Sequence, residues 1–254
     1  MNSLDPIAMP APATTLTPAP GVTWEQLPPD FILPNDPVDH IHQPALAAAL
    51  TESLRLADRL PEQALTATNY GICATVNGKV VVKAPDWAYI PVITVPRSDV
   101  ERSYTPRLQG AIPALVLEFL SETDGGEYSI KETFPPGKFL FYEQILQVPN
   151  YGIFDLATGS LEFYRLKEEQ RYALESPQEQ TRFWVPEMQL FLGVWQGKRD
   201  HRDGSWLRWW DDQGQLLPWD TEKIDQERQR VEQERQRGDR LAAQLRAAGL
   251  EPEL

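Results

Sequence analysis

The sequence contains a single cysteine, Cys73, and only three histidines among its 254 residues. One thiol can form neither a disulfide framework nor a thiolate zinc site, so we expect a reducing, cytoplasmic location. No apolar run approaches the roughly 18 residues that indicate a membrane span, and the first residues lack the pattern of a signal peptide. The G-x-S-x-G pattern of serine hydrolases and the G-x-x-x-x-G-K-[ST] loop of nucleotide-triphosphate hydrolases are also missing.

An excess of basic charge is absent as well, because the formal net charge is −13. This balance argues against a broad phosphate-binding surface, since nucleic-acid-binding proteins normally display a basic face. A metal-dependent nuclease can still be acidic, because its carboxylates hold the cation that meets the phosphate. The charge therefore lowers the expectation of nucleic-acid binding without removing it.

Three segments differ in composition. Residues 1–22 are rich in proline, alanine and threonine and are predicted to form a disordered tail. Residues 23–220 carry the apolar and aromatic side chains, and they predict one α/β domain, a mixed sheet flanked by helices with a β-rich C-terminal extension. Residues 221–254 are rich in glutamate, arginine and glutamine and predict a charged helix.

Local patterns locate helices and strands within the middle segment. Apolar residues at helical spacing predict an amphipathic helix over 40–60. The pair Asn77-Gly78 between two apolar stretches predicts a β-hairpin. The nearly all-apolar run 112–120 is typical of a strand covered on both faces, and a second helix is predicted over 135–148, after two prolines.

Tryptophans are concentrated near the end of the middle segment, at positions 206, 209, 210 and 219. Such side chains could stack on nucleic-acid bases. Packing in the core of the β-rich extension is the favoured interpretation, because clustered aromatic side chains bury a large apolar area.

The charged helix carries a sparse apolar pattern. Ile224, Val231 and Leu245 share one heptad position and Leu241 occupies the other core position, but Gly238 and two glutamates fill the remaining core positions. This pattern predicts at most a weak coiled coil. A solvated helix and a self-associating helix remain alternative interpretations.

Two acidic residues lie where burial makes a charge unfavourable. Glu118 lies within the apolar run Leu-Val-Leu-Glu-Phe-Leu, and a carboxylate on a buried strand must be protonated, paired or bound to a metal. A buried arginine, Arg107 or Arg165, is one possible partner. Asp86 opens another apolar strand, where it is either a turn residue or a ligand for a cation.

Together the two acids predict a site for a hard divalent cation, Mg²⁺ or Mn²⁺. One carboxylate from each of two neighbouring strands, with a main-chain carbonyl and water, suits the oxygen coordination of magnesium. Lys138, at the start of the second helix, would orient water or neutralise developing charge, or would be a solvated helix-start residue. Glu127 could be an outer acid of this site, but a solvated turn is the favoured interpretation.

The pattern KAPDWAYIPV…ALVLEFLSETDGGEYS…PPGKFLFYEQILQVPNYGIFDL resembles the Uma-type restriction endonuclease family, which belongs to the PD-(D/E)xK nuclease-like superfamily. The resemblance runs from about His40 to Leu166 and continues more loosely through the tryptophan-rich part. It implies a restriction-endonuclease-like sheet for the α/β fold.

By this resemblance, Asp86 and Glu118 match the two acidic positions of the family motif. The superfamily lysine is expected two residues after the glutamate, where this chain has Leu120. Lys138 matches a lysine that has moved to the next helix, and the resemblance therefore implies that these three charged residues form one site.

Two functional hypotheses follow. The first is a Mg²⁺- or Mn²⁺-dependent endonuclease that hydrolyses DNA phosphodiester bonds, with Asp86 and Glu118 as metal ligands and Lys138 assisting. A homodimer would suit this activity, because cutting both strands of a duplex usually takes two sites. The alternative is a catalytically inactive nuclease-fold protein that acts through its C-terminal helix.

Overall fold

The computed structural model describes residues 21–26, 28, 42–120, 126–132, 134–178 and 181–247. Of the predicted tail, residues 1–20 lie outside this part of the chain. Val22 belongs to the short strand β1 (Val22–Thr23), so the end of the predicted tail is part of the fold.

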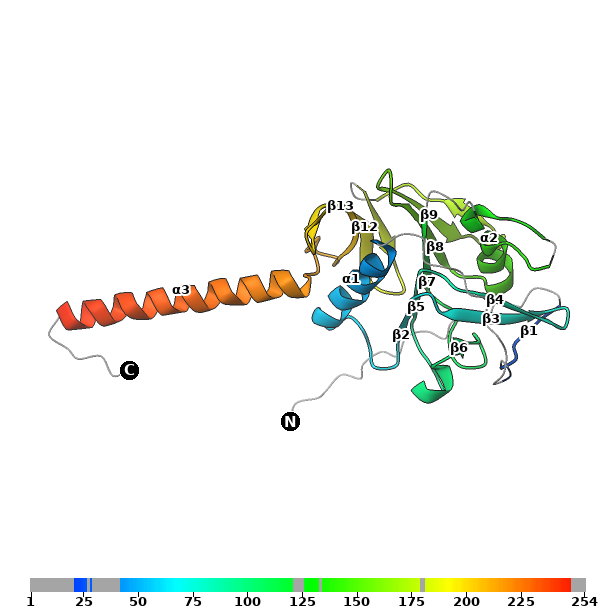
Figure 1. Ribbon diagram of the computed structural model, residues 1–254, viewed down its shortest axis with the longest axis horizontal. Helices are drawn as coiled ribbons and strands as arrows, with labels where there is room; N and C mark the ends of the chain where they lie inside the picture. The colour runs from blue at the N-terminus through cyan, green and yellow to red at the C-terminus, as the bar shows by residue number, and fades with distance from the viewer. Residues whose placement is uncertain are drawn as a thin grey trace, which may run out of the picture.

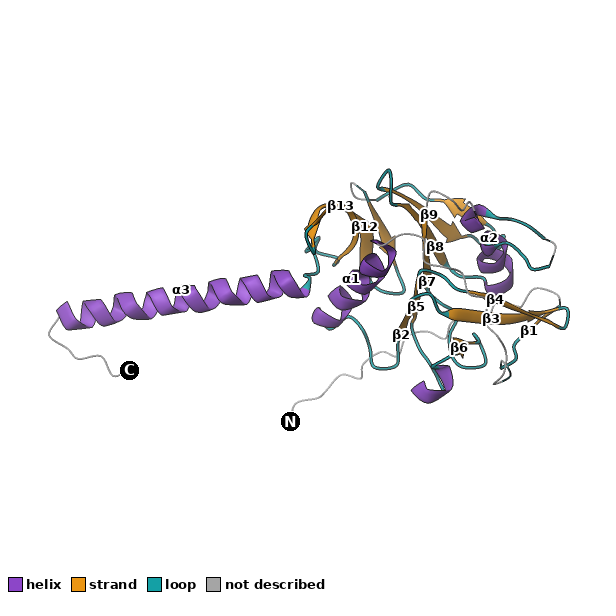
Figure 2. Ribbon diagram, in the orientation of Figure 1, coloured by secondary structure: helices purple, strands orange, loops and turns teal. Residues whose placement is uncertain are grey.

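The centre of the fold is a mixed six-stranded sheet (Figure 2). Its spatial order is β10-β9-β8-β7-β5-β2, in which β7 and β8 are parallel and the other neighbours are antiparallel. Its strands are β2 (Leu65–Ala67), β5 (Trp87–Ile90), β7 (Leu115–Leu120), β8 (Asn150–Asp155), β9 (Ser160–Leu166) and β10 (Tyr172–Leu174). The predicted α/β class with a mixed sheet is confirmed.

Strand β7 is covered on both faces, which explains why its apolar residues do not alternate with polar ones. Leu115, Leu117 and Phe119 pack into the core on one side of the sheet. Val116 packs into a separate core cluster on the other side, and Glu118 shares that face because side chains alternate along a strand.

Helix α1 (His42–Leu56) packs on the first face of the sheet (Figure 1). Its buried side chains follow the predicted helical spacing: Leu46, Leu50 and Leu54. The helix ends earlier than the predicted limit of residue 60, because Asp58 adopts a left-handed conformation with φ of 55°. The predicted hydrophobic face is confirmed and the C-terminal boundary was placed too late, while residues 40 and 41 lie outside the described part of the chain.

The other face is covered by helix α2 (Lys138–Leu140), which continues directly into a π-helical segment, η3 (Phe141–Leu146). Phe141, Tyr142 and Leu146 are buried there against the sheet. The helix predicted after the two prolines is therefore present, and it begins at Lys138.

A smaller sheet contains β1, β3 (Gly71–Val76), β4 (Lys79–Lys83) and β6 (Ser103–Tyr104). The short 3₁₀ helix η1 (Arg97–Val100) lies in the chain between β5 and β6, and a second one, η2 (Gly126–Tyr128), follows β7. Strands β3 and β4 form the predicted hairpin. Asn77 and Gly78 both have positive φ, 50° and 74°, which a two-residue type I′ turn requires.

A third sheet forms the β-rich extension, with strands β11 (Arg182–Val185), β12 (Leu190–Arg199) and β13 (Arg202–Trp210). The clustered tryptophans are all at most 5% exposed: Trp206, Trp209, Trp210 and Trp219. Their predicted role in core packing is confirmed, and the buried rings are not available to stack on bases.

Helix α3 (Asp220–Ala247) is 28 residues long and projects away from the sheets (Figure 1). None of its described side chains is buried. The predicted charged helix over 221–254 is thus present up to Ala247, and residues 248–254 lie outside the described part. Within the described ranges, we find no helix with the length and apolar character needed to cross a membrane.

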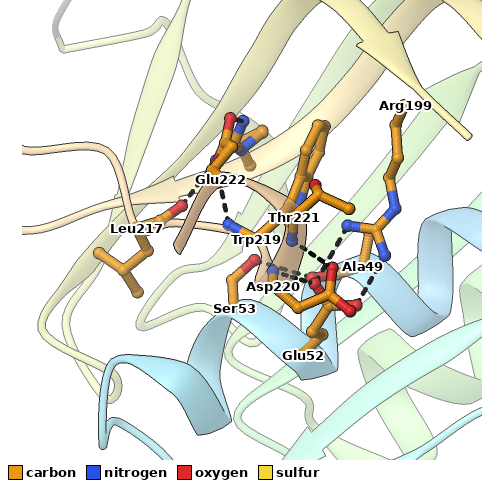
Figure 3. Close-up of polar contacts among 10 residues, drawn as sticks. Ala49, Glu52, Ser53, Arg199, Leu217, Trp219, Asp220, Thr221 and Glu222 are labelled. Atoms are coloured by element: carbon orange, nitrogen blue, oxygen red, sulfur yellow. Dashed lines mark hydrogen bonds and ion pairs between the residues drawn. The ribbon is translucent and has the colours of Figure 1, made fainter. Parts of the chain in front are cut away.

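The base of α3 is fixed by a fully buried arginine. Arg208 on β13 donates two hydrogen bonds to the Glu222 carboxylate, at 2.8 and 2.6 Å, and its guanidinium lies 3.7 Å from the centroid of the Trp219 ring. Glu222 also accepts a 2.8 Å hydrogen bond from the Trp219 N–H, one of the backbone donors that a helix start leaves unpaired (Figure 3).

A second ion pair joins the same region to α1 (Figure 3). Arg199 on β12 donates to both oxygens of Glu52, at 3.2 and 2.6 Å. Glu52 also accepts a hydrogen bond from the Asp220 N–H at the first residue of α3. One carboxylate therefore ties α1, β12 and α3 together, so the direction in which α3 leaves the body is fixed at several points.

We predict that Glu222→Ala destabilises the fold by about 3 kcal/mol, because it leaves the buried Arg208 guanidinium without its anion. The change is measurable as a lower urea midpoint. Glu232→Ala, on the exposed part of α3, is the matched control and should change stability by less than about 0.5 kcal/mol. Equal effects of the two variants would contradict this account of the anchor.

Candidate active site

Asp86 lies directly before β5 and binds the neighbouring strand β7. Its Oδ2 accepts a hydrogen bond of 2.5 Å from the Phe119 N–H. Burial raises the pKa of Asp86, while this hydrogen bond, the Lys138 ammonium and a side-chain hydrogen bond with Glu118 lower it, and the net direction is upward. Asp86 is thus held beside Glu118 and is not a simple turn residue.

Glu118 lies in the middle of β7 and is completely buried. Its Oε1 accepts a 2.9 Å hydrogen bond from the Tyr142 hydroxyl, and its Oε2 lies 3.2 Å from the Lys138 ammonium. Burial raises the pKa of Glu118 to about 8, and the nearby Asp86 carboxylate also raises it, although Lys138 and Tyr142 act in the opposite direction. Desolvation therefore outweighs the attraction of the ammonium.

The arginines considered as partners of Glu118 lie elsewhere, so that alternative was wrong. Arg165 donates to the Asn150 side chain at 2.9 Å and to the Trp184 carbonyl at 2.6 Å. Arg107 lies over the ring of Trp24, 5.7 Å from its centroid. The cationic partner of Glu118 is Lys138.

Lys138 reaches the two acids from the first turn of α2. Burial lowers the pKa of Lys138, but the carboxylates of Glu118, Asp86 and Glu127 raise it by a larger amount. The net shift is upward, so the ammonium stays charged. Gly137, directly before it, allows a close approach to the preceding loop, because a Cβ at this position would lie 2.0 Å from the Ser129 carbonyl oxygen.

Two residues of this cluster were missed or misread from the sequence. Glu127 was interpreted as part of a solvated turn, but it is only 6% exposed and lies 3.6 Å from the Lys138 ammonium. Its position after two glycines favoured a turn and hid its burial. Tyr142 follows Lys138 by four residues, and this spacing, which places side chains on one helix face, was the available signal.

The residue expected to be a lysine in the superfamily, Leu120, is partly buried and packs against the same core cluster as Val116. It shares a face of β7 with Glu118, because the two are separated by two positions. Lys138 brings its ammonium to the same carboxylate from a helix. The structure thus brings Asp86, Glu118 and Lys138 together.

The acids suit a divalent cation by their chemistry. Across the described ranges, no group of three or more His, Cys, Asp and Glu side chains is arranged to hold a metal. The candidate donors are therefore the two carboxylates of Asp86 and Glu118. Magnesium is commonly bound through one or two carboxylates with water completing the octahedron. Burial disfavours the charged forms of Asp86 and Glu118 and raises their pKa values, and a bound cation would stabilise those charged forms.

Two acids on adjacent strands of a mixed sheet, with a lysine beside them, form the arrangement that the sequence resemblance to a restriction-endonuclease family implied. A family model described as "Uma2: Putative restriction endonuclease" matches residues 29–197. The chain belongs to this family, as the sequence resemblance implied.

A search of curated proteins gives no match. A crystal structure of a "putative nuclease belonging to DUF820" from Anabaena variabilis ATCC 29413 is similar to this chain, with a TM-score of 0.36 and 13% sequence identity. The similarity covers 60% of this chain and 76% of that one.

We predict that stability falls as pH rises between about 5 and 8 in the absence of metal. Glu118 has an ordinary pKa of 4.5 when unfolded and about 8 when folded, so over this window the folded state binds more protons. This contribution is complete below pH 4.5 and is lost as pH rises through 8, with a slope of up to about 1.4 kcal/mol per pH unit.

The measurement is the urea midpoint against pH for the native chain and for Glu118→Gln, in the presence of a chelator. The variant should give a flatter profile. Glu52 and Glu222 do not interfere, because their pKa values are lowered: burial raises them, but the hydrogen bonds from Arg199 and Arg208 outweigh it. The stability that these two carboxylates contribute is therefore lost only below about pH 4.5. Parallel profiles would refute the prediction.

Proposed function

We propose that this protein is a divalent-metal-dependent endonuclease that hydrolyses phosphodiester bonds of DNA. The observation that carries the proposal is the contact of Lys138 with the buried Glu118, at 3.2 Å, beside Asp86. The superfamily has a lysine on the strand where this chain has Leu120, and Lys138 on the following helix takes its place. The charges of a PD-(D/E)xK site are thus assembled from different positions in the sequence. The family description supports nuclease chemistry.

Asp86 and Glu118 would hold the metal ion. Bound there, Mg²⁺ or Mn²⁺ would supply a water of lowered pKa and would offset negative charge on the phosphate. The protein contributes the placement of the two carboxylates, which the hydrogen bond between Asp86 and the Phe119 N–H fixes across two strands.

Lys138 would act on the nucleophile and on the phosphate. Its ammonium keeps its proton, because the surrounding carboxylates raise its pKa. It can therefore donate hydrogen bonds to an attacking water and to a phosphate oxygen as negative charge develops there. Tyr142 would position Glu118 through the hydrogen bond to Oε1, which keeps one carboxylate oxygen directed toward the helix.

One observation favours the second candidate, an inactive nuclease-fold protein. Both oxygens of Glu118 are already engaged by protein donors, Tyr142 and Lys138, and Asp86 is bonded to a backbone amide. Such a cluster can be a satisfied polar core that binds no metal. The two candidates differ in metal binding, which can be measured without a cleavage assay.

We predict that Mg²⁺ or Mn²⁺ raises the thermal midpoint of the native chain. At a metal concentration about 100 times Kd, the gain is about 2.7 kcal/mol, or roughly 5–10 °C for a chain of this size. Asp86→Asn and Glu118→Gln should abolish the shift, while Glu132→Gln, at an exposed site, should keep it. A native chain that shows no shift would support the inactive protein.

We further predict that the native chain nicks or linearises supercoiled DNA only when the metal is present. Lys138→Met should lower the rate about 10²- to 10³-fold, which is typical for the loss of one donor to the developing charge. The same variant should keep the metal-induced thermal shift, because the two carboxylates remain. An unchanged cleavage rate for Lys138→Met would contradict a role for Lys138 in the mechanism.

A further inference from the structure

Helix α3 projects away from the sheets and carries a stripe of exposed apolar side chains. Ile224, Val231, Leu241 and Leu245 are between 38% and 58% exposed. At 1.5 Å per residue the 28-residue helix is about 42 Å long. The stability of a helix in a protein comes mainly from packing of its apolar face, and the described residues beyond the first turn provide no such surface.

We propose that α3 pairs with the α3 helix of a second copy of this chain, in antiparallel orientation. The stripe identifies the contact face, because Ile224, Val231 and Leu245 share one heptad position, with Gly238 between the last two, and Leu241 takes the second core position. This inference is independent of the proposed nuclease activity, since it concerns only the helix that lies outside the sheets.

The charge of α3 changes sign along its length. Residues 220–232 contain five acidic and three basic side chains, whereas residues 233–247 contain two acidic and four basic ones. Antiparallel pairing places the acidic half of one helix against the basic half of the other. Parallel pairing would place like halves together, which is unfavourable.

The heptad register gives the same orientation. In a parallel pair, Glu227 and Glu234 would each face the same glutamate of the second copy in the core. In the antiparallel pair, Ile224 meets Leu241 of the second copy, which makes an apolar layer at each end of the contact. Between these layers, Glu234 meets Val231 and no two glutamates face each other.

Gly238 completes this register, because it lies opposite Glu227 of the second copy. No heavy atom lies within 4 Å of where its Cβ would be, so within one chain nothing requires a glycine there. A glycine in a helix interior is unfavourable by about 1 kcal/mol relative to alanine. Opposite a long side chain, the missing Cβ leaves room for Glu227 to pass toward Arg235 and Arg237 of the second copy.

The anchor at the base of α3 gives the pair a defined geometry. The Arg208–Glu222 and Arg199–Glu52 ion pairs hold the start of the helix. In an antiparallel pair, the two bodies would therefore lie at opposite ends of a helix pair about 42 Å long.

The mass of the full chain in solution tests the pairing. Light scattering at high protein concentration and low salt should give twice the 28.9 kDa chain mass. Ile224→Asp should return the protein to one chain mass, while Gln226→Asp, the same charge change on the outward face of α3, should leave the dimer intact. A single chain mass for the native protein, or equal behaviour of the two variants, would overturn the proposal.

Cross-linking tests the orientation. Ile224→Cys and Leu241→Cys are prepared separately and then oxidised alone and as a mixture; the native Cys73 is buried and does not take part. Antiparallel pairing predicts a disulfide dimer only in the mixture, because identical positions lie too far apart for a disulfide. Dimers of either variant alone, as parallel helices would form, would overturn the orientation.

Discussion

The carboxylate of Glu118, enclosed in the middle of β7, is the constraint on which the site depends. A buried acid needs donors, and here both come from one segment, Lys138 and Tyr142 on the α2–η3 helix. The helix that covers this face of the sheet is therefore also the element that satisfies the acid. Packing and site chemistry share the same contacts, so neither can change without the other.

The carboxylates of this protein fall into two groups by the direction of their pKa shifts. Those that hold the base of α3, Glu52 and Glu222, have lowered pKa values because each accepts hydrogen bonds from an arginine. Asp86 and Glu118 have raised values, because burial outweighs the single ammonium that they share. Acids whose burial is not offset by neighbouring donors and cations have perturbed pKa values, and such residues cluster at functional sites.

Much of the fold could be predicted from the sequence where the local signal was strong. The Asn77-Gly78 turn and the apolar run of β7 gave the hairpin and a strand covered on both faces. Glu118 was identifiable because a charge within an apolar run is anomalous. The resemblance to a nuclease family was needed to connect it with Lys138, since nothing local relates residues twenty positions apart.

Other contacts had no equivalent signal in the sequence, or their signal was overlooked. Glu127 follows two glycines, and turn composition concealed its burial. Arg208 stands among tryptophans in the stretch Trp-Leu-Arg-Trp-Trp, where it is as anomalous as Glu118 in its own strand. The same reasoning would have marked it as a buried charge, but its partner Glu222 is specified only by the meeting of β13 with α3.

The hydrogen bond from the Phe119 amide to Asp86 has a consequence for how the site tolerates change. It fixes the two acids to each other through the pairing of β5 with β7, whereas the lysine depends on the intervening chain between Leu120 and Lys138. Insertions or deletions there would leave the acids in register and would move the α2–η3 segment, so that the Lys138 ammonium and the Tyr142 hydroxyl shift together. Such a change would keep the two acids side by side but would take away both donors to the buried Glu118 carboxylate, which would then be far more costly to keep charged.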